Sequence, residues 1–310
     1  MGEKFLPVAT NTKVTNASAS ILNPTANWVE LPADLTGNIL QRIGMFDILQ
    51  NAQKVCTTWR KICKDPAMWR VIYMDNSSGT RSRLLCQEIC KLAVDRSQGQ
   101  LVDLSITHLV THSLLQYISD RSSQLKRLEV IYNHGDLHGK WGAYLKKFPL
   151  LEELSLEKAH IEPKDIEDAG RYCPMLKTLK LNRMHEVDSG KSYDDVQLRL
   201  SEMAITIGKS LHNLRHLELV QDSISNIGLQ AILDGCYRLE SLDICQCPFI
   251  DLKKDDIGKT CSEQIEDLKL PGDDAAYRYY GDLSYDDFIV VDEDGYPIGD
   301  LSDMMAPFSV

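Results

Sequence analysis

The chain has 310 residues, 43% hydrophobic and 25% charged, a composition that can fold as two domains or one elongated array. Its formal net charge is −11, but ten acidic residues and one basic residue, Arg278, lie from Pro271 onward. The preceding 270 residues are near neutral and contain no Lys/Arg-rich run, which argues against a nucleic-acid partner. No run of 18 apolar residues occurs, so we expect no membrane partner.

The N-terminal segment, residues 1–27, is rich in Thr, Asn, Ser and Ala and lacks the apolar region of a secretory signal. We expect it to be disordered. The nine cysteines are an odd number, and without a secretory signal they are expected to be reduced thiols. We therefore expect the protein to work in the nucleus or the cytoplasm, or in both.

From residue 28 the chain reads WVELPADLTGNILQRIGMFDILQNAQKVCTTWRKICKDPAMWR, which predicts three short helices. The first has Pro32 at its first position, and Gly44 stops it. The second has Asp47 as its N-cap and runs unbroken to residue 64. Asp65 and the proline after it then start a third, which carries Trp69, Ile72 and Tyr73.

The second helix has two adjacent apolar stripes, where a surface helix needs one. They are Ile48, Ala52, Val55, Trp59 and Ile62, and beside them Leu49, Cys56 and Cys63. The second stripe could pack on the rest of the chain or dock on another protein. The residues alone leave both interpretations open.

The order of landmarks resembles the F-box: Leu-Pro, an Ile-Leu pair, Val-Cys-x-x-Trp-Arg and a final Trp, over residues 28–74. The fuller run is similar to plant F-box/LRR-repeat proteins. This resemblance implies docking on a Skp-type adaptor, and through it on a cullin-based ubiquitin ligase. Carried over by position, it implies the adaptor-binding residues Leu31, Pro32, Leu35, Ile39, Leu40, Ile43, Val55, Cys56 and Trp59. Which of them touch the adaptor and which hold the helices together is left open.

A helix over Ser82–Val94, within a connecting segment at 75–98, is expected to cap a repeat array. Residues 99–270 repeat Leu-x-x-Leu-x-Leu about seven times, from Leu101, Leu125, Leu151, Leu176, Leu214, Leu239 and Ile265. The spacing of 24–26 residues, with one longer step of 38, is typical of leucine-rich repeats. The predicted fold class is therefore α/β: three F-box helices, then a solenoid of parallel strands and returning helices.

Returning helices are predicted over 108–119, 166–172, 198–210 and 227–233, with a loop near 185–195. Strand alternation turns the leucines inward, and the residues beside the second leucine outward onto a concave face. We predict that this face binds a protein substrate, with a mild preference for basic partners. Its residues are Arg127, Glu129, Glu153, Ser155, Thr178, Lys180, His216, Glu218, Ser241 and Asp243, with Asp103, Ser105, Asp267 and Lys269 at the ends.

Cys173 and Cys236 occupy one register of the repeat, which resembles the cysteine-containing subclass of leucine-rich repeats. We expect them to be small buried residues where a helix returns to a strand.

Motifs for bond chemistry are incomplete. The pairs His108/His112, His134/His138 and His212/His216 lack the glutamate of a metalloprotease, and Cys245-x-Cys247 lacks a second pair for zinc. The two Gly-Lys-Ser runs lack the first glycine of a P-loop. We therefore expect no catalytic site, metal or cofactor.

The acidic segment 271–310 is expected to be disordered and to act as a solubilising, self-shielding or partner-binding tail. The sequence favours a non-catalytic, substrate-recognition subunit of a ubiquitin ligase. A repeat scaffold without ubiquitin delivery and a small-molecule receptor remain as alternatives.

Overall fold

The computed structural model describes residues 31–79, 81–131, 137, 139–182, 193–220, 224–253 and 256–272, with the backbone alone for 193–200. The predicted N-terminal segment 1–27 and nearly all of the acidic tail lie outside these residues. So do His134, His138 and residues 185–192 of the predicted loop.

The first part is a small helical segment in which short α-helices alternate with 3-10 turns: α1 (Ala33–Leu40), η1 (Gln41–Ile43), α2 (Met45–Gln50), η2 (Ala52–Lys54), α3 (Thr57–Ile62) and η3 (Pro66–Trp69). The first helix begins one residue after Pro32, and Gly44 follows η1 with φ +84°, a conformation that favours glycine. Asp65 caps η3 by accepting a hydrogen bond from the Ala67 amide at 2.9 Å.

The prediction of one unbroken second helix is wrong, because the chain divides it into α2, η2 and α3. Asp47 lies inside α2 rather than capping it. The break comes at Cys56, whose extended backbone starts α3 and whose Sγ accepts a hydrogen bond from the Trp59 amide. The β-branched residues on either side, Val55 and Thr57, lose side-chain freedom in a helix and favour this break.

The second part is a single eight-stranded parallel sheet in sequential order from β1 to β8. Its strands are β1 (Val71–Asp75), β2 (Asp103–Thr107), β3 (Arg127–Ile131), β4 (Glu153–Glu157), β5 (Thr178–Asn182), β6 (His216–Glu218), β7 (Ser241–Asp243) and β8 (Asp267–Lys269). Each of the seven predicted repeats supplies one strand, which confirms the leucine-rich solenoid.

One strand was not expected. The predicted third helix ends at Trp69, and Ile72 and Tyr73 belong to β1, which pairs with β2. The sheet therefore starts within residues 28–74, which the sequence assigned to the F-box. Alternation explains the change, because Ile72 and Met74 are buried while Val71 and Tyr73 are exposed.

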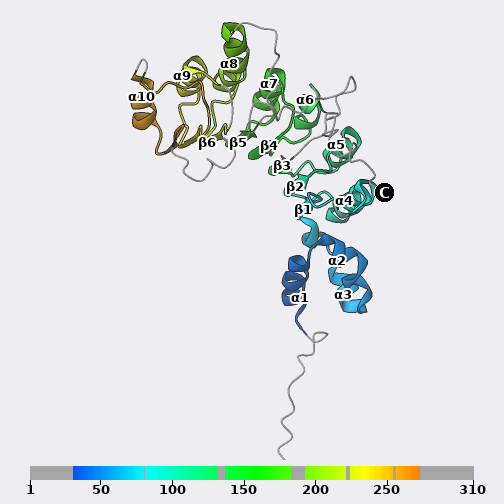
Figure 1. The fold of residues 1–310 in the computed structure, drawn as a ribbon. Helices are drawn as coiled ribbons and strands as arrows, with labels where there is room; N and C mark the ends of the chain where they lie inside the picture. The colour runs from blue at the N-terminus through cyan, green and yellow to red at the C-terminus, as the bar shows by residue number, and fades with distance from the viewer. Residues whose placement is uncertain are drawn as a thin grey trace, which may run out of the picture.

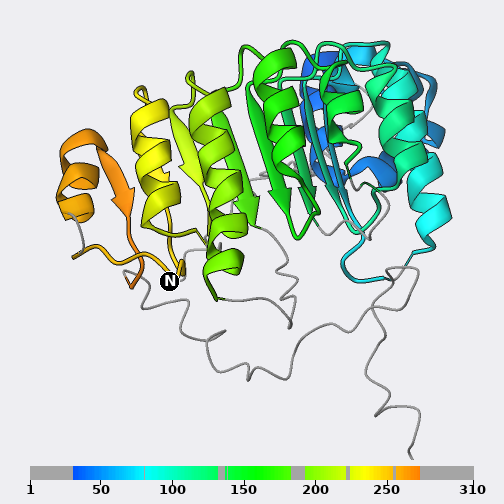
Figure 2. The ribbon, with the colours of Figure 1, turned by 90° about the horizontal axis from the view of Figure 1, so that it is seen from above.

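A helix follows each of the strands β1 to β7, and these helices lie along one side of the sheet (Figures 1 and 2). They are α4 (Arg83–Ser97), α5 (His112–Ser119), α6 (Trp141–Leu145), α7 (Pro163–Tyr172), α8 (Tyr193–Ser210), α9 (Asn226–Gly235) and α10 (Ile257–Gln264). The five helices predicted in this part are present; α6 and α10 were not predicted. The helical segment 33–69 lies at the β1 end of the solenoid, beside β1 and α4 (Figure 1).

The core is continuous through both parts, because buried side chains from Leu40 and Trp69 to Ile265 belong to one hydrophobic cluster. Cys173 and Cys236 are buried within it, and each thiol donates to a backbone carbonyl of the preceding repeat at 3.6 Å. Their predicted role at the helix-to-strand return is thereby confirmed.

Candidate functional site: an apolar row and a concave face

The helical segment exposes a row of large apolar side chains along α1 and η1. Gly37 faces Met68 and Ile62, so that side of α1 packs against η3 and α3. Leu35 and Ile39 are one helical turn apart and are 48% and 38% exposed, and Ile43, the next residue in this series, is 43% exposed. Such a row costs free energy in water unless a partner covers it.

Val55 adds a fourth exposed apolar side chain, at 60%, in the break between η2 and α3. Among the other predicted adaptor-binding residues, Pro32 is exposed and Leu31, Cys56 and Trp59 are half-buried. Leu40 is 1% exposed and lies in the core, so its contribution is to hold the helices together. We call Leu35, Ile39, Ile43 and Val55 the apolar row; their contact with an adaptor stays a prediction.

The two stripes that suggested a surplus face are used mostly inside the chain. Ile48, Ala52, Leu49 and Cys63 are each 5% exposed or less. Except for Val55, the exposed large apolar side chains of this segment therefore lie on α1 and η1 and not on the predicted second helix.

Contacts from α4 fix the helical segment to the solenoid. Arg96 donates to the Cys63 carbonyl at 3.0 Å and to the Gln53 Oε1 at 2.8 Å, and its guanidinium lies 5.4 Å from the Trp69 ring centroid. Trp69 also donates its indole N–H to the Cys63 carbonyl at 3.0 Å. The orientation of the apolar row relative to the sheet therefore depends on packed and hydrogen-bonded contacts.

The concave face has the predicted alternation. The second leucine of each repeat from Leu104 to Leu242 is buried, and most residues beside it are partly or fully exposed. The exceptions are Ser105 and Ser155, which are 4% and 7% exposed and contribute little surface. Because the strands are in register, the outward residues form rows that run across the sheet.

Arg127 lies at the centre of the most connected cluster on this face. Its guanidinium contacts Asp103 at 3.0 Å, Glu129 at 3.1 Å and Glu153 at 3.3 Å, and Ser105 donates to Glu129 at 2.6 Å. Burial opposes the charged form, but the hydrogen bond to Asp103 and the charges of Glu129 and Asp103 outweigh it and hold the pKa of Arg127 above its ordinary value. The cluster carries three negative charges against one positive charge.

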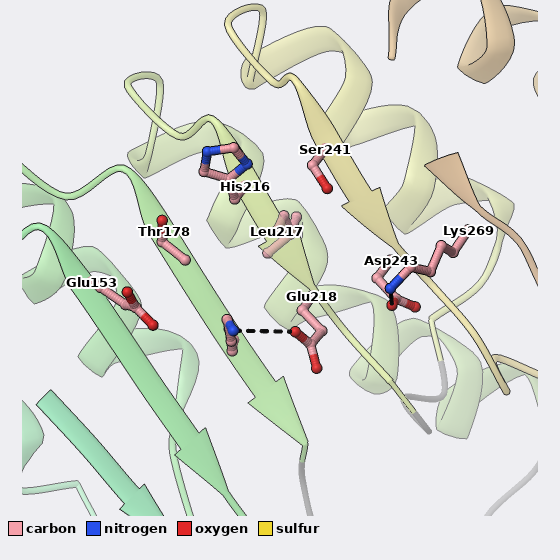
Figure 3. Close-up of a pocket in the computed structure, with 9 residues that line it drawn as sticks. Glu153, Thr178, His216, Leu217, Glu218, Ser241, Asp243 and Lys269 are labelled. Atoms are coloured by element: carbon pink, nitrogen blue, oxygen red, sulfur yellow. Dashed lines mark hydrogen bonds and ion pairs between the residues drawn. The ribbon is translucent and has the colours of Figure 1, made fainter. Parts of the chain in front are cut away.

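A hollow of about 300 Å³ lies farther along the face, over β4 to β8 (Figure 3). Lys180 pairs with Glu218 at 3.7 Å, and Lys269 pairs with Asp243 at 2.9 Å. His216 and Thr178 also line it, and within the described part of the chain neither side chain has a hydrogen-bond partner. Its walls are mostly polar, whereas small-molecule pockets are mostly apolar.

β1 extends the concave face with residues that sequence reasoning did not include. Val71 and Tyr73 are 61% and 63% exposed, and they stand in register with Asp103 and Ser105 of β2. The face therefore runs from an apolar and aromatic edge, past the Arg127 cluster, to the hollow.

The histidines of the pair His212/His216 lie in different surroundings. His212 binds the Gly235 carbonyl and stacks on Tyr237, whereas His216 lies on the concave face. Cys247 donates to the Leu219 carbonyl. No cluster of three potential metal ligands occurs among the described residues, and no helix there is long and apolar enough to cross a membrane.

The F-box-like family model matches residues 28–75. The chain is 43% identical over 249 residues to putative F-box/LRR-repeat protein 23 of Arabidopsis thaliana, covering 80% of this chain and 54% of that protein. It is 40% identical to putative F-box/LRR-repeat protein 21, covering 82% and 85%, and 38% identical to F-box protein SKIP19, covering 93% and 89%, both also from Arabidopsis thaliana. The chain thus spans about half of the first relative and most of the other two.

Proposed function

This chain belongs to the F-box/LRR-repeat family, and we propose that it is the substrate-recognition subunit of a ubiquitin ligase of the type built on a Skp-type adaptor and a cullin. In this proposal the F-box binds the adaptor and the concave face binds the protein to be ubiquitinated. The chain itself makes and breaks no bonds. It contributes proximity, because it holds a substrate lysine near a ubiquitin-loaded enzyme that other subunits supply.

The observation that supports this proposal best is the apolar row. Four large side chains from α1, η1 and the η2–α3 break are 38–60% exposed in a segment whose fold already has a buried core. Covering them would remove apolar surface from water at ~25 cal/mol per Å². The apolar row consists of uncharged side chains, and the cores of stable protein interfaces are likewise depleted of charged residues.

Adaptor binding is tested with the full chain and a purified Skp-type adaptor by calorimetry. We expect Leu35→Asp and Val55→Asp each to weaken binding at least tenfold, because each buries a carboxylate against the adaptor. Leu84→Asp is the matched control, since Leu84 is 73% exposed on α4, outside the F-box. If both F-box variants are folded and bind like the unmodified chain, the apolar row is not the adaptor surface.

Ubiquitin delivery is tested by adding the cullin. A ligase subunit should enter one complex with adaptor and cullin, and it should do so only when the adaptor is present. A chain that binds the adaptor but never joins the cullin would instead be a scaffold.

Substrate recognition is assigned to the concave face because it combines an aromatic edge with excess negative charge. Its outward residues include six acidic and three basic side chains, which favours a basic partner segment. We expect basic peptides from a charge-varied library to bind the full chain more tightly than acidic ones. Glu129→Lys and Glu218→Lys should reduce this preference, and an unchanged preference in both variants would exclude the face.

The hollow over β4 to β8 is the feature that a small-molecule receptor would use. Ligand-dependent thermal stabilisation in a metabolite screen would favour that alternative function. The mostly polar lining of the hollow favours a protein partner over a small molecule.

A further inference from the structure

A second recess lies on the F-box, where it meets α4. It has a volume of about 630 Å³ and is lined by Gln53, Lys54, Cys56, Thr57, Arg60, Lys64 and Arg96. Four of these seven residues are cationic and none is acidic. We call this recess the basic pocket.

The cations of the basic pocket have no carboxylate partner within the described residues. Lys54, Arg60 and Lys64 are exposed and form no ion pair there, while Arg96 donates to the neutral oxygens of Cys63 and Gln53. On the concave face, by contrast, Arg127, Lys180 and Lys269 are each paired. The positive charge of the pocket is therefore available to an anionic partner.

Charge along the chain is divided in a way that identifies such a partner. Residues 31–70 contain six basic and three acidic residues, whereas residues 71–270 have five more acidic than basic residues. Residues 273–310 contain ten acidic residues and one basic residue, and six of the acids lie within 282–294. The F-box is the positive part of an otherwise acidic protein.

We propose that the acidic segment 273–310 of this chain binds in the basic pocket. The length of the segment permits it. Eight strands at a spacing of ~4.8 Å place β1 about 34 Å from β8. The 20 residues from Gly272 to Asp292 can span up to ~66 Å, which also covers the step from β1 to the F-box.

The concave face is the nearer surface, but it does not suit this segment. Its outward side chains have three more negative than positive charges, so the acidic segment is repelled there. Charges in water are screened beyond ~8 Å at physiological ionic strength, so the attraction acts only when segment and pocket are in contact. Binding should therefore be weakened by salt.

Contact can be measured in the full chain by carbodiimide coupling followed by peptide mass spectrometry. The reagent joins a lysine Nζ to a touching carboxyl group as an amide and carries off the carboxyl oxygen in its urea. We expect Lys54 and Lys64 to couple mainly to acids of 282–294, at low salt and not at high salt. Lys253 is the matched control, because it is exposed and lies only 19 residues before Gly272.

Arg60 provides the second arm, because carbodiimide does not couple arginine. Arg60→Glu leaves both pocket lysines in place but reverses one charge in the pocket. It should reduce the coupling of Lys54 and Lys64 to the acids of 282–294 at least threefold. Arg83→Glu is the control at an exposed arginine outside the pocket. A mixture of chains with and without ¹⁵N separates coupling within one chain from coupling between copies.

The proposal is overturned if Lys253 couples to the segment more than the pocket lysines do, if Arg60→Glu leaves the coupling unchanged, or if the products join two copies. One consequence rests on the proposed function: Cys56 lines the pocket and belongs to the predicted adaptor surface, so segment and adaptor should compete. Neutralising the acids of 282–294 would then raise adaptor affinity several-fold. Coupling is measured without adaptor. It therefore tests the binding of the segment in the pocket independently of the proposed binding of the adaptor.

Discussion

Arg127 offers the most direct test of the concave face, because one guanidinium joins three carboxylates from three strands. Replacing it by methionine keeps an unbranched side chain of about the length of the arginine stem up to Nε and removes the charged guanidinium. Asp103, Glu129 and Glu153 would then face one another without a cation. We expect the strands β2 to β4 to be destabilised locally, since stability in a repeat protein comes from neighbouring units.

The magnitude follows from geometry and exposure. A hydrogen bond to a charged group contributes ~1.5–3 kcal/mol, and an exposed pair only ~0–1 kcal/mol. The four side chains are 23–33% exposed and make three contacts of 3.0–3.3 Å, which places the cluster between these limits. We therefore expect Arg127→Met to cost about 2 kcal/mol, or a roughly 30-fold change in a local opening equilibrium.

Amide hydrogen exchange measures this opening strand by strand. Exchange in β2, β3 and β4 should rise roughly 30-fold, because the three carboxylates then face one another without their shared cation. Lys180→Met is the matched control: its single pair with Glu218 is longer, at 3.7 Å, and more than 40% exposed on both sides. Equal effects of the two substitutions would refute the cluster as a cooperative unit.

Three further predictions concern packing, thiols and pH. Gly235→Ala should lower the free energy of unfolding by about 1–3 kcal/mol in urea titrations, because the added methyl collides with a backbone carbonyl of α8. Burial raises the pKa of the Cys236 thiol to about 12, so iodoacetamide should modify half-buried Cys56 first; equal rates would contradict this. Burial opposes ionisation of Asp243, but hydrogen bonds from Lys269 and the Cys245 amide outweigh it and lower its pKa below 3.8. Its stabilisation is therefore present above its ordinary pKa and lost as the pH falls through the lowered pKa, so Asp243→Asn should cost about 1 kcal/mol at neutral pH and progressively less as the pH falls through that lowered pKa in urea titrations.

The solenoid was predictable because its information is local and repeated. Each Leu-x-x-Leu-x-Leu run specifies a strand by alternation, and the strands from β2 to β8 start two residues after the first residue of their run. Parallel pairing in one register then places the outward residues in rows. The contacts of Arg127 with Asp103 and Glu153 follow from these rows, because the register places Arg127 between these two residues.

β1 was missed because its residues are a variant of the same pattern. Trp69, Ile72 and Met74 stand where the other repeats have leucines, and all three are buried. The aspartate-proline start before them favoured a helix, and η3 is indeed present, but it ends at Trp69. The local sequence therefore predicted where η3 begins, and the pairing of β1 with β2 determined where η3 ends.

The apolar row and the basic pocket depended on tertiary structure. The spacing from Ile48 to Ile62 is helical, yet the chain breaks at Cys56, and this break leaves Val55 exposed. The pocket requires Arg96 of α4 beside residues more than 30 positions earlier. No periodicity in the sequence encodes that proximity.

The junction between F-box and sheet bears directly on the proposed function. A flexible linker would let a bound substrate explore a large volume and would lower its effective concentration near the ubiquitin-loaded enzyme. Here Trp69 belongs to the common core, β1 follows it within two residues, and Arg96 ties α4 to the Cys63 carbonyl. The concave face is thus held in a defined orientation to the apolar row, so substrate position relative to the adaptor would be determined by folding rather than by chance encounter.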